Sequence, residues 1–474
     1  MQQLGAKVRA IRRRENLSQK KMAERLGISA SYLNLIEHNR RPLTASLLIK
    51  LVQHFAVDLQ TFSDDDDARR IGDLREVLSD PLFEGHEVTI HELKEFAVNS
   101  PAVAAAMLTL YRSWRSARES ASSLAGDLQE VEAAGGLDAS QLPSEEVHEL
   151  IHRHANHFAD LEAGADALRA ACGGEADYRA MAALADREQG LQVRVVKAGA
   201  MNGAVRHYDS YRAVISLSEV LPPRSRNFQL AHQLALLTQG EAMDRLTRSE
   251  VLTTDASRAL ARVALANYFA GAVLMPYTSF LEAARAFRYD VELLGHRFRT
   301  SFEQICHRLT TMRRPGDEGV PFHLIRVDMA GNISKRFSAS GIRFARFSGS
   351  CSRWNVFNAF QTPGRISVQL SRMPESDTYF CIARTISQNR GGYHAARAVH
   401  AVGLGCRMEH AKELVYSDGV DLSTPDAAIP IGVTCRLCER MDCTQRAVPA
   451  VNHPLTIDED VRGPSFYAPV VPVS

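Results

Sequence analysis

The first 62 residues carry short helical patterns separated by tight turns, and this spacing restricts the segment to a small all-helical bundle. Val8 and Ile11 share one face of a first helix, whose other faces carry basic residues. Ser18 and Ser29 are placed to cap a second and a third helix through their hydroxyl groups. Gly27, between these helices, reaches positive φ without steric cost. The pattern predicts a helix-turn-helix domain.

The charge of this segment indicates a polyanionic partner. Residues 1–62 contain 11 Lys and Arg against 4 Asp and Glu, whereas the whole chain has a formal net charge of only +1. Such an asymmetry is what neutralisation of DNA phosphates requires. Short polar side chains at the start of the third helix reach base edges in the major groove. The side chains expected to face outward there are Ser31, Tyr32, Asn34 and Glu37. A basic helical bundle with another use is the alternative.

Residues 17–43 resemble the Cro/phage-repressor-like (XRE) family along their whole length; they read LSQKKMAERLGISASYLNLIEHNRRPL. The resemblance implies that operator DNA is the partner of this domain. The residues at positions where that family contacts DNA are Gln19, Ser29, Ser31, Tyr32, Asn34, Asn39 and Arg40.

Composition indicates a large protein outside the membrane. No apolar run approaches the length needed to cross a bilayer, and the N-terminus lacks the apolar stretch of a signal peptide. Hydrophobic residues make up 45% of the 474 residues, enough for the cores of about three domains. Eight cysteines are too sparse for a disulfide scaffold. We therefore expect a cytoplasmic protein with no membrane partner, whose thiols are reduced or bind a metal.

Shifts in pattern divide the rest of the chain into three further parts. An acidic run at residues 64–67 and a helical pattern around Pro101 predict a solvated acidic and helical linker at 63–142, which we expect to form a homodimer or higher homo-oligomer. Helices and short strands mix at 143–314, and strands dominate from 315 to 474. The fold class expected is multi-domain: an all-α helix-turn-helix bundle, a helical linker, an α+β middle and an α+β C-terminal sensor with a cysteine-rich metal loop.

The middle part resembles the IrrE/ImmA-like zinc peptidases, whose helix carries an HExxH motif; here residues 228–237 read FQLAHQLALL. His232 matches the first zinc ligand, but Gln233 replaces the general base and Leu236 the second ligand. Val263 stands at the position aligned with the third ligand. Zinc hydrolysis needs three protein ligands and a base that activates water. We therefore predict a degenerate zincin-like domain with no catalytic residues and no enzyme activity. A working XRE–ImmA type metallopeptidase is the alternative.

Three cysteines near the C-terminus have the spacing C-x2-C-x4-C, which lets thiolates converge on one metal centre from a loop. Four ligands close such a site, and Cys406 is the fourth ligand that we expect. The residue types leave the metal open, because an iron–sulfur cluster and zinc both accept thiolates. Cys351 and Cys381 are expected to be core thiols. The three cysteines of the loop are Cys435, Cys438 and Cys443.

Motifs in the second half resemble the short-chain fatty-acid metabolism regulators, the PrpR/RamB/ScfR-like XRE proteins. The motifs are FHLIRVDMAGNISKRFSASG (322–341), GSCSRWNVFNAF (349–360), YFCIART (379–385), GLGCRMEHA (403–411) and IGVTCRLCERMDCTQRAVP (431–449). The resemblance covers nearly the whole chain. It implies a cytoplasmic bacterial regulator of propionate, methylcitrate or glyoxylate-type genes that responds to a short-chain acyl-CoA. For part of the family it also implies a 4Fe–4S cluster on the cysteines of the loop.

An acyl-CoA requires cations for its phosphates and an apolar slot for its acyl chain. Residues 323–400 contain arginines interleaved with aromatic side chains. The candidates for acyl-CoA contact are Arg336, Arg343, Arg346 and Trp354. A basic β-surface over an ordinary core explains these residues equally well, and only the family resemblance favours a ligand. A phage-type repressor or antitoxin without small-molecule sensing is the remaining alternative.

Overall fold

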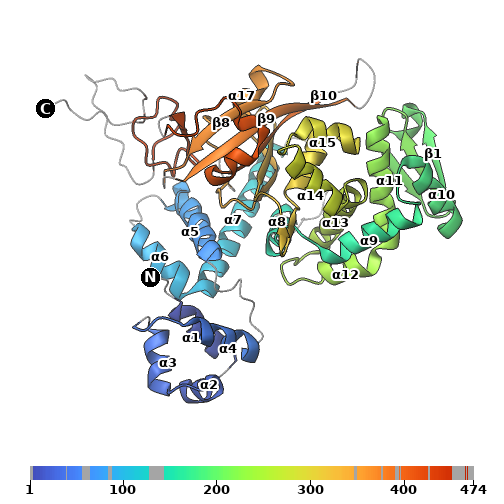
Figure 1. Cartoon of the computed structure of the whole chain (residues 1–474). Coiled ribbons are helices and arrows are strands. Elements are labelled where there is room, and N and C mark those ends of the chain that lie inside the picture. Colours follow the sequence, from blue (N-terminus) through green and yellow to red (C-terminus); the bar gives the residue numbers. More distant parts are fainter. Residues whose placement is uncertain are drawn as a thin grey trace. The chain divides into compact units, whose positions relative to one another are not determined.

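The structure, a computed structural model, falls into two compact units, Met1–Ser140 and Gln141–Ser474 (Figure 1). Each unit is described by itself. The residues that the structure describes are 4–15, 17–38, 40–55, 64–83, 88–127, 143–345, 350–374, 377–389, 394, 397–424, 427–450, 465 and 467.

The first unit begins with the predicted helix-turn-helix bundle. Ser18 accepts a hydrogen bond from the backbone N–H of Lys21, and Ser29 accepts one from that of Tyr32, so both predicted caps are formed. Gly27 ends the second helix with a φ of +68°, a conformation that glycine adopts without strain. The all-helical fold predicted here is confirmed. Its helices are α1 (Gly5–Arg14), α2 (Gln19–Leu26), α3 (Ala30–Glu37) and α4 (Ala45–Phe55).

Three further helices follow in the first unit. Residues 64–67, expected to belong to an acidic and helical linker, begin the first of them. Thr89 and Glu92 form a capping box at the next helix, and Pro101 opens the last one. The helices are α5 (Asp64–Leu78), α6 (Ile90–Asn99) and α7 (Pro101–Asp127).

The second unit begins with helices around a small sheet. Strand order is β1-β3-β2, with β1 parallel and β2 antiparallel to β3. Ile215 and Leu217 of the central strand pack against the helices in one hydrophobic core, the peptidase-like core. The elements are α8 (Pro143–Arg153), α9 (Ala159–Ala171), α10 (Tyr178–Gln189), β1 (Gln192–Val196), β2 (Arg206–Asp209), β3 (Val214–Ser218), α11 (Pro223–Thr238), α12 (Gly240–Thr247) and α13 (Asp255–Leu274).

A six-stranded sheet dominates the C-terminal part. Its order is β11-β8-β9-β10-β6-β7, antiparallel throughout except for the short parallel pair β11–β8. The helices are α14 (Tyr277–Ala286), α15 (Val291–Phe298), α16 (Phe302–Leu309) and α17 (Asn355–Asn358). The strands are β4 (Arg313–Arg314), β5 (Asp317–Glu318), β6 (His323–Val327), β7 (Ile333–Ser338), β8 (Ser367–Arg372), β9 (Thr378–Asn389), β10 (Arg397–Arg407) and β11 (Ile429–Pro430).

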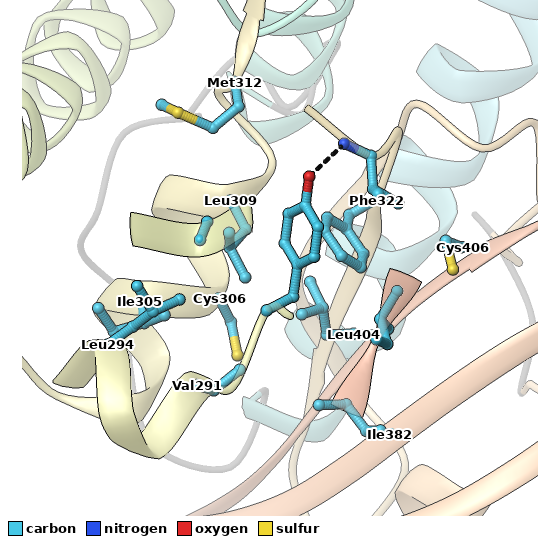
Figure 2. Close-up of a cluster of buried hydrophobic side chains, with 14 of the residues drawn as sticks. Val291, Leu294, Ile305, Cys306, Leu309, Met312, Phe322, Ile382, Leu404 and Cys406 are labelled. Atoms are coloured by element: carbon cyan, nitrogen blue, oxygen red, sulfur yellow. Dashed lines mark hydrogen bonds between the residues drawn. The ribbon is translucent and has the colours of Figure 1, made fainter. Parts of the chain in front are cut away.

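The two faces of this sheet belong to different cores. On one face, side chains of β6, β9 and β10 pack against α14, α15 and α16; Figure 2 shows part of this helix-side core. The other face packs against α17 and the segment around Ile431, which we call the loop-side core. Helices α14–α16 therefore share a core with the sheet, although the sequence placed them with the peptidase-like part that ends at residue 314. Val273, near the end of α13, belongs to the peptidase-like core, whereas Met275, two residues later, belongs to the helix-side core.

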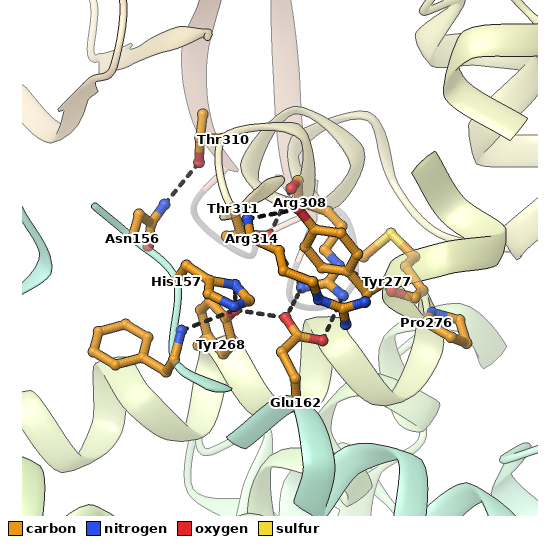
Figure 3. A network of polar contacts seen from close by, with 12 residues as sticks. Asn156, His157, Glu162, Tyr268, Pro276, Tyr277, Arg308, Thr310, Thr311 and Arg314 are labelled. Atoms are coloured by element: carbon orange, nitrogen blue, oxygen red, sulfur yellow. Dashed lines mark hydrogen bonds and ion pairs between the residues drawn. The ribbon is translucent and has the colours of Figure 1, made fainter. Parts of the chain in front are cut away.

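A buried ion pair lies where the peptidase-like core meets the helix-side core (Figure 3). The guanidinium of Arg308 donates to both carboxylate oxygens of Glu162, at 2.6 and 2.9 Å, and its Nε donates to the carbonyl of Met275 at 2.9 Å. The hydroxyl of Tyr268 donates to the same carboxylate. The side chains of Arg308 and Glu162 are only 1% and 6% exposed, so each charge is balanced by the other instead of by water.

Membrane-spanning potential is weak in the described part of the chain. No single helix there is long and apolar enough to cross a bilayer. The pair α13–α14 passes the same test of length and composition only when taken together, across a bend of 67°. Both helices contribute buried side chains to the cores, which explains their apolar composition.

Candidate functional site

The start of α3 presents the predicted DNA-contacting residues on the bundle surface. Ser31, Asn34 and Arg40 are exposed, whereas Tyr32 is half-buried. The hydroxyl of Ser29 is used as the helix cap. Asn39 lies outside the described residues.

Gln19 has a supporting position in this surface. Its amide nitrogen donates to Oδ1 of Asn34 at 3.2 Å and to Oε2 of Glu37 at 2.7 Å. The side-chain carbonyl of Asn34 is therefore engaged within the protein. Its amide N–H groups are the part of this side chain suited to an external acceptor.

Glu37 is buried, and the prediction that it faces outward is wrong. It is 1% exposed, and Arg12 donates to its two carboxylate oxygens at 2.6 and 3.0 Å. Burial raises the pKa of Glu37, but the hydrogen bonds from Arg12 and Gln19 outweigh this effect and the pKa is lowered overall. Helix α1 is thereby tied to the end of α3. Helical spacing does not reveal this pair, because the partners are 25 residues apart in the chain.

The remnant of the zinc motif lies inside the peptidase-like core. His232 is buried, and burial, with the nearby charge of Arg206, lowers its pKa to about 4. Nδ1 of His232 has no hydrogen-bond partner among the described residues, and Val263, which is 43% exposed, has an aliphatic side chain that cannot ligate a metal. Gln233 is buried and Leu236 packs with the core. In the described part of the chain, no three His, Cys, Asp or Glu side chains converge on a point that could hold a metal.

Arg446 fixes the shape of the cysteine loop. Its Nη1 donates to the carbonyl of Cys435 at 2.7 Å, and its Nη2 donates to that of Cys438 at 2.7 Å and that of Arg440 at 2.6 Å. The residue is almost fully buried. This one guanidinium satisfies three backbone carbonyls of the loop.

Cys351 lies beside this loop. Its backbone N–H donates to the carbonyl of Val433 at 3.1 Å, and the preceding Gly432 lies against the Cys438 thiol. Burial raises the pKa of Cys351, and the thiols of Cys435 and Cys438 are close enough to raise it further. The sequence suggested only a core thiol here, and its separation from the C-x2-C-x4-C pattern hid this proximity.

Cys406, which we expected to be the fourth ligand, lies in a different core from Cys351. It belongs to the helix-side core (Figure 2), whereas Cys351 belongs to the loop-side core on the opposite face of the sheet. Its neighbours include Glu409 and Glu413. The thiolate donors at the loop fit an iron–sulfur cluster or zinc in chemistry, but among the described residues the side chains are not gathered as a bound metal would gather them.

A small cavity opens on the loop-side face of the sheet. Its volume is about 10 Å³, room for about one water molecule. Trp354 is 5% exposed, and its indole N–H has no hydrogen-bond partner among the described residues. Burial lowers the pKa of His323 to about 3, which keeps that ring neutral. The lining residues are His323, Ile325, Ile342, Trp354, Asn355, Val356, Ser371, Cys381, Gly403, Leu404 and Ile431.

The arginines that we expected to bind an acyl-CoA together with Trp354 are not among the described residues that line this cavity. Arg336, on β7, forms an ion pair with Glu145 of α8. Arg343 lies near Tyr379. Arg346 lies outside the described residues. Trp354 thus lines the small cavity, whereas Arg336 and Arg343 are not among its lining residues.

Comparisons with known protein families divide the chain in the order that the sequence suggested. Residues 8–62 match the helix-turn-helix family, and residues 186–310 match the IrrE N-terminal-like domain. Residues 311–467 match the C-terminal domain of the short-chain fatty acyl coenzyme A regulators. All three resemblances seen in the sequence are confirmed.

Curated proteins resemble the chain over nearly its full length. The propionyl-CoA carboxylase regulator of Cereibacter sphaeroides is 40% identical over 97% of both chains. The HTH-type transcriptional regulator PrpR of Mycobacterium tuberculosis is 38% identical over 96% of this chain and 93% of its own. A solved Mycobacterium tuberculosis transcriptional regulator is 38% identical, with a TM-score of 0.67 over 69% of this chain and all of that one.

Proposed function

This chain belongs to the family of helix-turn-helix transcriptional regulators of short-chain fatty-acid metabolism, and we propose that it binds operator DNA through residues 1–62 under the control of a short-chain acyl-CoA. The single observation that carries the proposal is the full-length match of this chain, which has the helix-turn-helix and the regulator C-terminal domains, to relatives named as regulators. The propionate-related names of these relatives favour propionyl-CoA or acetyl-CoA as the effector.

Asn34→Ala is expected to weaken binding to the operator by about 1–3 kcal/mol, with little effect on random DNA, because an amide contact to a base edge is lost. Arg40→Gln should instead weaken binding to the operator and to random DNA alike. It should also reduce the slope of the salt dependence by about one, the effect of losing one phosphate contact. Fluorescence anisotropy with operator and scrambled duplexes at several salt concentrations measures both effects.

Gln53→Ala, an exposed amide on α4, serves as the matched control and should bind normally. Equal losses on operator and scrambled DNA for Asn34→Ala would contradict a base contact. Undiminished operator binding by a chain lacking residues 1–62 would contradict the DNA-binding assignment itself.

The cavity beside Trp354 is our candidate for the acyl end of the effector. A thioester carbonyl accepts hydrogen bonds, and the indole N–H of Trp354 is a buried donor without a partner among the described residues. Neutral and apolar groups line the rest of the cavity, which suits a short uncharged chain. The cavity holds about one water molecule, so a propionyl group requires its walls to move. Such a movement provides a physical link between ligand and sensor shape.

We place self-association on α7. Val103 and Leu110, seven residues apart on this helix, are 57% and 71% exposed, and Met107 lies between them. Side chains at this spacing form one apolar face, and a second copy of the helix covers such a face well. Sedimentation velocity over a concentration series distinguishes a homodimer or larger assembly from a monomer.

The middle domain is proposed to be non-catalytic. Of the three ligand positions in the zinc motif only His232 is kept, and it is buried, with its pKa lowered to about 4 by burial. Gln233 cannot act as a general base. Zinc-dependent, chelator-sensitive peptide cleavage that is lost in His232→Ala would favour the metallopeptidase alternative.

For the cysteine loop we propose a metal site of four thiolates, with Cys351 in place of Cys406 and a 4Fe–4S cluster favoured over zinc by the family resemblance. The supporting observations are the contact of Cys351 with Val433 and that of Cys438 with Gly432. A bound cluster would supply sensitivity to oxygen and iron. The loop itself positions the thiols through Arg446.

Anaerobically purified protein is expected to contain iron and sulfide and to absorb in the visible range. Cys351→Ala should abolish both signals, as should removal of any of the three loop thiols. Cys406→Ala is the matched buried control and should retain them. Stoichiometric zinc without iron would identify a structural zinc site, and loss of the cluster in Cys406→Ala but not in Cys351→Ala would restore the original assignment.

A further inference from the structure

A half-buried arginine lies beside the remnant of the zinc motif. Arg206 begins β2, and its Nη1 donates to the side-chain oxygen of Gln229 at 2.9 Å and to the backbone oxygen of the same residue at 3.3 Å. Its register partner on β3 is Leu217, which points into the peptidase-like core. The guanidinium is therefore held against α11, on the side of the sheet where His232 is buried.

Among the residues that the structure describes, no acidic side chain compensates this charge. Arg206 forms no ion pair with any described residue, and its Nε and Nη2 donate to no described group. Burial lowers the pKa of Arg206 to about 10, and no neighbouring carboxylate opposes this effect. Arg169 provides a comparison, because its pKa is also lowered by burial but Asp166 and Glu175 partly restore it. A desolvated cation without a counter-charge is unfavourable unless a ligand supplies one.

A second arginine lies on the same helix face. Arg226 precedes Gln229 by one helical turn and donates from Nη2 to the backbone carbonyl of Glu219 at 3.0 Å. Its Nε is buried without a hydrogen-bond partner among the described residues, and it too forms no ion pair with them. Arg206 thus contacts Gln229 directly, Arg226 stands one turn before Gln229 on α11, and each guanidinium keeps a donor that no described group accepts.

We propose that Arg206 and Arg226, with Gln229 between them, bind the oxyanion of a small molecule, a carboxylate or phosphate group, beside the site where this peptidase-like domain has lost its zinc ligands. Planar guanidinium groups with free N–H donors match two oxygens of such an anion. The anion supplies the charge that the protein lacks at this point. The site is separate from the cavity at Trp354 and does not depend on the acyl-CoA proposal.

The test uses the full chain, with inorganic phosphate and acetate as probes and chloride as the reference at constant ionic strength. Calorimetric titration should detect binding of at least one probe to the wild type, and thermal unfolding should shift upward with its concentration. Arg206→Gln should weaken the apparent affinity at least about tenfold, since a charge-assisted hydrogen-bonded pair is lost. In chloride alone this variant should be at least as stable as the wild type, because a desolvated charge is removed.

Arg194→Gln is the matched control, an arginine on β1, across the central strand β3 from β2, that hydrogen-bonds Ser216. It should leave phosphate and acetate binding unchanged. Arg206→Lys keeps the charge but loses the planar guanidinium. If Arg206→Gln fails to fold, this variant serves as the test. Weaker binding of phosphate or acetate by Arg206→Lys supports the site. The proposal is overturned if neither probe exceeds chloride, or if binding survives the loss of Arg206. A preference for phosphate over acetate, or the reverse, identifies the class of ligand.

Discussion

Glu162→Gln is expected to lower the free energy of unfolding by about 3–5 kcal/mol, because it leaves the guanidinium of Arg308 buried without its counter-charge. Both side chains are almost fully enclosed between two cores (Figure 3). Chemical denaturation of the full chain, followed by fluorescence and circular dichroism, measures the change. Glu188→Gln is the matched control, since its pair with Arg187 is more than half exposed and should contribute about 0–1 kcal/mol at most.

The paired replacement Glu162→Leu with Arg308→Met should recover much of this loss, because two apolar side chains carry no uncompensated charge. A loss as large as that of the single variant would mean that shape, not charge balance, dominates at this position. Little or no effect of Glu162→Gln alone would show that water reaches the site.

The same pair predicts a sensitivity to acid. Burial alone would raise the pKa of Glu162, but the charge and hydrogen bonds of Arg308 and the hydrogen bond of Tyr268 lower it overall. A carboxyl group whose folded pKa is depressed stabilises the fold above its unfolded pKa, and this contribution is lost as the pH falls through the folded value. The wild type should therefore lose more stability on acidification than Glu162→Gln, which has no carboxyl group to protonate.

Propionyl-CoA or acetyl-CoA is expected to change operator affinity by roughly 5- to 150-fold, the usual range of coupling between two sites. Free CoA should have a smaller effect, because it lacks the acyl group that we place in the cavity. By thermodynamic reciprocity, operator DNA must shift the affinity for the thioester by the same factor. Titrations of labelled operator with each thioester at fixed salt measure the coupling.

Trp354→Phe separates the hydrogen bond from the shape of the cavity. It keeps an aromatic ring but removes the indole N–H, so the difference between acyl-CoA and free CoA should shrink. Trp114→Phe, in the other compact unit, is the matched control and should leave this difference unchanged. Superimposable operator curves for every thioester, on protein with an intact cysteine loop, would favour a phage-type repressor or antitoxin without small-molecule sensing.

The sequence by itself was sufficient for features set by neighbouring residues. Ser18, Gly27 and Ser29 act through hydrogen bonds and backbone angles within one turn, so their roles could be predicted without the fold. The loss of the zinc motif was equally local, because Gln233 and Leu236 stand in one helical segment. The family resemblance extended this knowledge to the order of the domains.

Tertiary structure alone decided which distant residues meet. Glu37 is buried because Arg12 reaches it from another helix, and no local pattern encodes that pairing. The pleat of β10 places Cys406 on the helix-side face, and a register one residue different would have turned its thiol toward the other face. Cys351, far from the loop in sequence, is brought to it by a backbone contact with Val433. Local chemistry thus fixed what each segment can do, and the strand register and the packing of distant helices fixed which segments act together.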